Sequence, residues 1–223
     1  MVVTICLYSN MVYSSFSNTL PEGFVYVKDI IPSIVLDMRY YTEDNFVGQR
    51  IDGYEKPRCI LSKKAAIALK KVQEELRIFG LELKIFDAYR PQQAVDHFVR
   101  WAKNIGNVKM KTKYYPDVDK KNLFRDGYIA AKSSHSRGST VDLTIISLFP
   151  IKPLELDMGT GFDFFGPLSW PDSKAVKPDQ RAHRMLLQTL MTKHGFKPLQ
   201  EEWWHFTLKD EPFPDTYFDF TIK

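Results

Sequence analysis

The order in which helix-like and strand-like segments follow one another constrains the fold of this 223-residue chain more than any other feature. An amphipathic helix is predicted from Ser62, its N-cap, to Phe79, with Gly80 as its stop. Further helices are predicted over 91–103 and 178–194, and strands over 24–27, 34–41, 81–86, 140–146 and 203–208. Because these segments do not form regular βαβ repeats, the order favours the α+β class, with a central, mainly antiparallel sheet flanked by helices.

The chain divides into a short N-terminal appendage and one compact domain. Residues 1–20 end at a Pro-Glu-Gly turn, and their first eight residues are almost wholly apolar, like the hydrophobic region of a signal peptide. No positively charged residue precedes that run, so we favour a cytoplasmic location, with export as the alternative. The remaining residues, 21–223, have an ordinary length for a single domain.

Composition excludes several classes of partner and site. The net charge is +4, but its lysine clusters are short and no nucleic-acid-binding motif accompanies them, so we expect no nucleic-acid partner. No apolar run reaches the roughly 18 residues that a membrane-spanning helix needs. The two cysteines, Cys6 and Cys59, form no Cys-x-x-Cys pair, so free thiols are expected instead of a thiolate metal site.

Two distant stretches carry side chains that bind metals. In the first, His135 is followed by a turn and then by Asp142 in a predicted strand; in the second, His205 lies near the C-terminus. Imidazole nitrogen and carboxylate oxygen bind zinc at about 2.0–2.2 Å, and three protein ligands with one open position are typical of catalytic zinc. Each stretch alone is also typical of a capped turn or a core strand. Together they favour one zinc ion per chain, held by His135, Asp142 and His205.

Two further residues have the chemistry of a hydrolytic site. Glu202 comes three residues before His205, and in a regular strand the two would face opposite ways. We therefore expect Glu202 at the start of the strand or at a bulge, where it can act as general base on water at the metal. Arg90, at the exit of a predicted strand, is either a surface charge or a group that stabilises an oxyanion.

These residues lie in strings that resemble the D-Ala-D-Ala metallopeptidases. The pattern SxHxxGxxxD begins at Ser133, and ExxH begins at Glu202. The stretch SSHSRGSTVDLT is similar to the D-alanyl-D-alanine dipeptidases of the vancomycin-resistance type in particular. The likeness extends from about Phe24 to the last residue and includes DNFVGQRIDGYE, DAYRP, YYPDVDK, DMGTGFDFF, EEWWH and DEPFPDTYFDF.

The resemblance implies a role for each matching residue at the metal. His135, Asp142 and His205 match the zinc ligands of the family, and Glu202 matches its catalytic base. Arg90 matches the arginine that stabilises the tetrahedral transition state. The implied fold has a zinc site like that of the D-Ala-D-Ala peptidases and the hedgehog proteins.

The resemblance also implies a substrate site. Asp163 matches the acidic group that receives the free ammonium of the substrate, while Tyr40 and Ser133 match residues of the substrate pocket. The implied activity is zinc-dependent hydrolysis of the dipeptide D-Ala-D-Ala to two D-alanines. A closed pocket that pairs the ammonium should reject longer peptides, whose amides cannot replace it.

Two alternatives accompany this interpretation. One is a D,D-carboxypeptidase or muropeptidase that acts on longer cell-wall peptides. The other is a non-catalytic zinc-binding module of the hedgehog type, against which Glu202 and Arg90 argue, because a binding module needs neither.

Overall fold

The computed structural model describes residues 19–149 and 153–223. The predicted N-terminal appendage lies almost entirely outside the described residues, as does Cys6. Cys59 is buried and free, as predicted. Among the described residues, no helix has the length and apolar character needed to cross a membrane.

A mixed six-stranded sheet forms the centre of the fold, in the order β2-β4-β5-β8-β7, with β6 also paired to β5. Adjacent strands in this sheet are antiparallel, except that β2 and β4 are parallel. The α+β class and the mainly antiparallel sheet are therefore confirmed. The strands are β2 (Val35–Leu36), β4 (Leu81–Asp87), β5 (Thr140–Ser147), β6 (Leu154–Glu155), β7 (Phe196–Pro198) and β8 (His205–Leu208).

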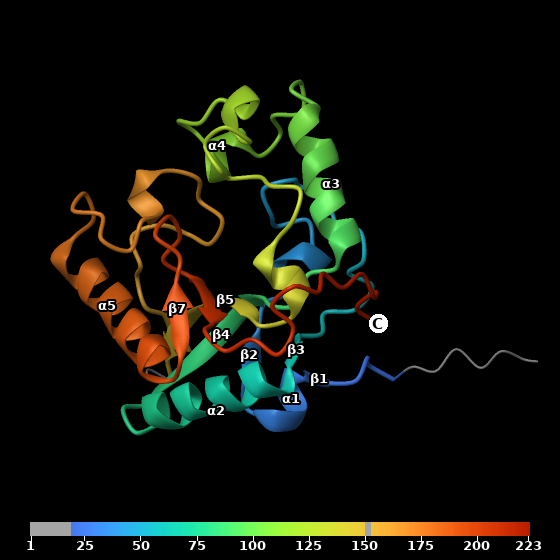
Figure 1. Ribbon diagram of the computed structural model, residues 1–223. Helices are drawn as coiled ribbons and strands as arrows, with labels where there is room; N and C mark the ends of the chain where they lie inside the picture. The colour runs from blue at the N-terminus through green and yellow to red at the C-terminus, as the bar shows by residue number, and fades with distance from the viewer. Residues whose placement is uncertain (1–18, 150–152) are drawn as a thin grey trace, which may run out of the picture.

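Helices flank this sheet, and a two-stranded sheet of β1 (Phe24–Tyr26) and β3 (Ile60–Ser62) lies beside it. Helix α2 (Lys63–Arg77) packs on β4, and α5 (Pro178–Lys193) packs on β7. At the opposite end of the molecule from α2 stand α3 (Gln92–Lys103) and α4 (Lys111–Tyr114), whereas α1 (Val27–Ile30) lies beside α2 (Figure 1).

Helix α2 begins as its sequence predicts. The Ser62 side chain accepts a hydrogen bond from the Ala65 amide, which satisfies one of the free N–H groups of the first turn. The helix ends at Arg77, before the predicted Phe79, which is 71% exposed.

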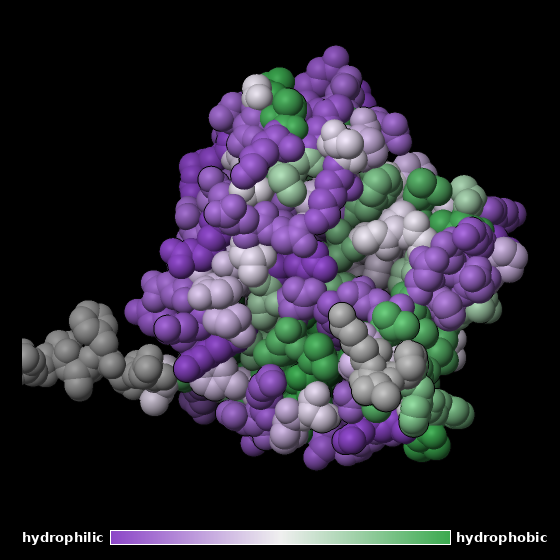
Figure 2. All heavy atoms as spheres, turned by 180° about the vertical axis from the view of Figure 1, so that it is seen from behind, coloured by the Kyte–Doolittle hydropathy of each residue, from purple (hydrophilic) through white to green (hydrophobic). Residues whose placement is uncertain are grey.

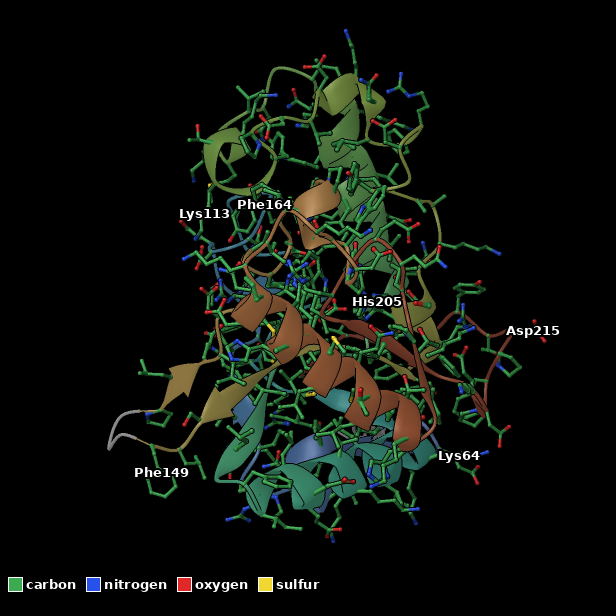
Figure 3. The ribbon with its side chains drawn as sticks, turned by 90° about the vertical axis from the view of Figure 1, so that its left-hand side faces the viewer. Lys64, Lys113, Phe149, Phe164, His205 and Asp215 are labelled. Atoms are coloured by element: carbon green, nitrogen blue, oxygen red, sulfur yellow. The ribbon has the colours of Figure 1, made fainter. Side chains whose placement is uncertain are left out.

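Other exposed apolar side chains lie near the C-terminal end of α2. Phe149 is one of them: its ring lies so close to Gly80 that a Cβ added there would meet it, and it projects beside the β5–β6 turn (Figure 3). Apolar side chains also gather in the lower part of the rear face, which is otherwise largely polar (Figure 2).

Two predicted strands differ from the structure in ways that affect the site. The strand predicted over 34–41 is regular only at Val35–Leu36, and Arg39–Tyr41 form the 3₁₀ helix η1, which buries Tyr40. The strand predicted over 203–208 begins only at His205, because the residues before it form a turn. In both cases tertiary contacts override the strand preference of β-branched and aromatic residues.

Candidate active site

The three predicted metal ligands meet at one point. One ligand atom from each of His135, Asp142 and His205 lies within 4.8 Å of the others. Asp142 Oδ2 is 3.2 Å from His135 Nε2, Asp142 Oδ1 is 3.1 Å from His205 Nδ1, and the two nitrogens are 3.3 Å apart. Two ligands at about 2.0–2.1 Å from a tetrahedral ion lie about 3.3–3.4 Å from each other. The two short Asp142 distances use different oxygens of the carboxylate, so the distances show that the three side chains lie close enough to share one cation.

Strand register and one tight turn bring these residues together. Asp142 and His205 are direct partners across the antiparallel strands β5 and β8, so their side chains leave the same face side by side. His135 lies in the 3₁₀ helix η3 (Ser134–Arg137), just before β5. Gly138 ends that helix with φ 79°, a left-handed conformation that glycine adopts without steric cost.

Neighbouring groups orient both imidazoles. His135 Nδ1 lies 2.7 Å from the Ala88 carbonyl oxygen, and His205 Nε2 lies 3.4 Å from Ser134 Oγ. When those nitrogens carry the protons, His135 Nε2 and His205 Nδ1 are left with free electron pairs at the centre of the cluster. Such outer contacts fix the tautomer of metal-binding histidines.

The electrostatics of the cluster also fit a cation. Asp142 is 1% exposed, and its Oδ1 accepts no hydrogen bond from the described residues, which is unfavourable for a buried carboxylate. Burial acts to raise the pKa of Asp142, but His135 and His205 lower it overall. Burial lowers the pKa of His135, which favours the neutral imidazole that a metal needs. Burial also acts to lower the pKa of His205, but Asp142 raises it overall, so a metal would compete with a proton there.

Glu202 lies beside the cluster, at the place expected from the sequence. It belongs to the turn before β8, and its Oε2 is 3.5 Å from His205 Nδ1. Burial raises the pKa of Glu202 to about 7, with a further contribution from the Asp142 carboxylate. A carboxylate with a pKa near neutrality is well matched to accepting and returning a proton.

Arg90 is held inside the site, which excludes the surface-charge alternative. Its side chain is 12% exposed, and its Nε donates to Asp87 Oδ2 at 2.9 Å. One of its terminal nitrogens lies 3.4 Å from Asp142 Oδ2, and its guanidinium lies over the rings of Tyr40 and Phe98. The guanidinium is therefore rigid and adjacent to the metal cluster.

Asp87 and Tyr54 complete the support of Arg90, and neither was predicted as a site residue from the sequence. Asp87 is fully buried and accepts a hydrogen bond of 2.7 Å from the Tyr54 hydroxyl. The available signal was the spacing of Asp87 and Arg90, since an acid three residues before an arginine at a strand exit can form a local ion pair.

Asp163 and Tyr40 lie together in the same cavity. The Tyr40 hydroxyl is 2.9 Å from Asp163 Oδ2 and 3.2 Å from Oδ1. Asp163 has φ 60°, and no other non-glycine residue in the described part of the chain has positive φ; such strain persists where the surrounding structure enforces it. Burial, with a contribution from Asp142, raises the pKa of Asp163 well above its usual value. A cationic group would stabilise its charged form.

One cavity joins all the predicted site residues. Its volume is about 340 Å³. Ser133 lines it and caps η3, where its Oγ accepts a hydrogen bond from the His135 amide. In Figure 3, His205 lies in the interior of the molecule, below the lobe that carries α3 and α4. The lining includes Tyr40, Arg90, Ser133, His135, Asp142, Asp163, Glu202 and His205, with Phe46, Phe98 and Phe165 as apolar walls.

Comparison with known proteins agrees with this geometry. Residues 21–223 match the peptidase family described as D-Ala-D-Ala dipeptidase. Three proteins named D-alanyl-D-alanine dipeptidase are similar to the chain. The one from Enterococcus faecalis is 40% identical over 92% of this chain and 100% of its own length, and the one from Streptomyces coelicolor is 42% identical over 89% of this chain and 98% of its own length. The one from Escherichia coli is 36% identical over 80% of this chain and 81% of its own length. The predicted resemblance is confirmed, and the chain belongs to the D-Ala-D-Ala dipeptidase family of metallopeptidases.

Proposed function

We propose that this protein is a zinc-dependent dipeptidase that hydrolyses D-Ala-D-Ala to two molecules of D-alanine. The observation that carries the proposal is one cavity with a three-ligand cluster and Glu202 at one end and the buried pair of Asp163 and Tyr40 at the other. The names of the relatives agree with this substrate.

The metal is expected to bind to His135, Asp142 and His205. When bound, zinc supplies Lewis-acid chemistry, which polarises a carbonyl oxygen and makes water a nucleophile at neutral pH. Two imidazoles and a carboxylate also accept iron or manganese, but three protein ligands with one open position are typical of catalytic zinc, which supports zinc.

Side chains of the protein carry out proton transfer, charge stabilisation and substrate binding. The Glu202 carboxylate takes a proton from the attacking water and later delivers it to the nitrogen of the leaving D-alanine. Arg90, fixed by Asp87, stabilises the negative charge that develops on the carbonyl oxygen. Asp163 pairs with the ammonium of the dipeptide, and Tyr40 donates a hydrogen bond to the same carboxylate.

The buried position of Asp163 supports a dipeptidase over a carboxypeptidase or muropeptidase. A longer peptide brings an amide to Asp163 in place of an ammonium, and a buried carboxylate without a cation is strongly unfavourable. The lining of the same cavity by Glu202 and Arg90 argues against a non-catalytic zinc-binding module, since simple metal binding requires neither residue.

The proposal is tested by turnover of D-Ala-D-Ala beside L-Ala-L-Ala, with and without a chelator. We expect hydrolysis of the D,D-dipeptide, its loss on chelation and its return on addition of zinc. N-acetyl-D-Ala-D-Ala serves as the matched substrate without an ammonium and should be a poor one. A zinc-loaded protein that cleaves the acetylated peptide as well as the free dipeptide would support the carboxypeptidase alternative instead.

A further inference from the structure

Arg184 is a buried arginine that lies outside the catalytic cluster and binds a single stretch of backbone. It belongs to α5 and is 2% exposed. Its Nε donates to the Met158 carbonyl at 2.7 Å, one terminal nitrogen donates to the Trp170 carbonyl at 2.7 Å, and the other donates to the Leu168 carbonyl at 2.8 Å. One side chain thus connects the two ends of residues 158–170.

That stretch carries Asp163 near its middle. It has no strand and only the short 3₁₀ helix η4 (Pro167–Ser169), so backbone pairing fixes little of its shape. In Figure 3, Phe164, the residue after Asp163, lies above His205. The strained φ of Asp163 requires that the surrounding contacts hold the backbone firmly.

A second set of contacts ties the same stretch to the turn that carries Glu202. Trp203 Nε1 donates to Thr160 Oγ1 at 2.9 Å, and the Trp203 amide donates to the Ser169 carbonyl, also at 2.9 Å. The Ser169 hydroxyl in turn donates to the Phe164 carbonyl at 2.6 Å. The stretch is therefore held by Arg184 from α5 and by Trp203 from the catalytic turn.

Burying a charged guanidinium at this position is unfavourable for the free energy of folding. Burial lowers the pKa of Arg184 to about 10, and Asp157 offsets that shift only in part. A buried charge without a close carboxylate is tolerated where charged hydrogen bonds replace its hydration, as the three carbonyls do here. An apolar side chain could fill the same volume, but it could not hold three separate carbonyls in fixed positions.

We propose that Arg184 is a positioning residue for substrate binding, which holds Asp163 where it receives the ammonium of the dipeptide. The inference rests on the proposed function. It assigns to α5, which contributes no residue to the lining of the catalytic cavity, a part in selecting the substrate.

The test is the kinetics of Arg184→Met with D-Ala-D-Ala, after hydrolysis by the unmodified protein has been established. Because Arg184 acts through Asp163, its effect should not exceed that of losing the Asp163 charge, which is about 30-fold. We therefore expect KM to rise about 10-fold while kcat and zinc content change little. Arg184→Lys should restore part of the affinity. Arg181→Met is the matched control, because Arg181 lies on the same helix but donates to the Val176 carbonyl, outside the stretch; its KM should be unchanged.

A double-mutant cycle separates positioning from a merely structural role. If Arg184 acts through Asp163, adding Arg184→Met to Asp163→Asn should raise KM little further, whereas independent effects would multiply. A purely structural role would lower the melting temperature and the folded, zinc-loaded fraction at unchanged KM, and that result would overturn the inference.

Arg184→Lys keeps the test decisive if Arg184→Met fails to fold. Lysine keeps the positive charge but cannot hold all three carbonyls in the fixed geometry of a guanidinium. We expect a several-fold rise in KM with retained zinc, and an unchanged KM in Arg184→Lys would count against the inference. Failure of the unmodified, zinc-loaded protein to cleave D-Ala-D-Ala would instead refute the proposed function.

Discussion

The two ends of the cavity are built in different ways. At the metal end, two of the three ligands are cross-strand partners in the central sheet, and the third lies in the turn that leads into one of those strands. At the other end, Asp163 lies in a stretch without strands that contacts Tyr40, Arg184 and Trp203, which come from distant parts of the chain. The position of the His135, Asp142 and His205 cluster therefore follows from the register of the sheet, whereas the position of Asp163 depends on side chains that hold a loop.

The largest effect is expected at the metal end. Asp142→Ala should remove stoichiometric zinc binding and all measurable turnover, since Asp142 contacts both histidines. Metal analysis and the D-Ala-D-Ala assay check this result. An Asp142→Ala protein that keeps its zinc and its activity would show that the cluster is not the catalytic metal site.

Glu202→Ala should separate metal binding from chemistry within the same end. We expect zinc to remain stoichiometric while kcat falls by about 10²–10⁴-fold, the usual contribution of a general base. Glu201→Ala is the matched control, because Glu201 is the exposed neighbour in the same turn and does not line the cavity. An active, zinc-loaded Glu202→Ala protein would refute the assignment of the base.

Asp163→Asn should have a smaller effect and a different signature, which sharpens the comparison. The variant keeps the size of the side chain but loses the charge, and truncating a buried charge pair costs about 2 kcal/mol or more, or about 30-fold in kcat/KM. We expect most of that loss in KM, with unchanged zinc content. Steady-state kinetics decide the point: an unchanged kcat/KM would remove Asp163 from the substrate site.

The mildest probe is pH. Burial raises the pKa of Glu202 to about 7, and a protonated carboxyl cannot accept a proton, so activity belongs to the pH range above its pKa and is lost below it. A bound cation lowers this pKa, which places the acid limb of kcat/KM at or below about pH 7 with a slope of about tenfold per pH unit. The limb should disappear in Glu202→Ala, and it should be measured at constant zinc content because His205 also binds protons. A limb that persists in Glu202→Ala would assign it to another group.

Much of the metal end could be predicted from the sequence. The turn after His135, the β-branched strand around Asp142 and the aromatic strand at His205 all have local signals, and a sheet brings such elements together in register. The expected place of Glu202 at the start of its strand also follows from local geometry, because residues three apart in a strand face opposite ways.

Only the tertiary structure decided the rest. The spacing of Asp87 and Arg90 can indicate a local ion pair but not its burial, which depends on the rings of Tyr40 and Phe98 that lie against the guanidinium. Tyr40 also depends on distant contacts, because it lies in a 3₁₀ helix and not in the strand predicted over 34–41. Asp163 has partners that lie 21 or more positions away in the chain. The Tyr40 hydroxyl contacts it directly, and Arg184 acts through the backbone of residues 158–170. Periodicity and turn chemistry encode contacts between neighbours in the chain, whereas the position of a loop depends on packing between distant segments, which a single sequence does not display.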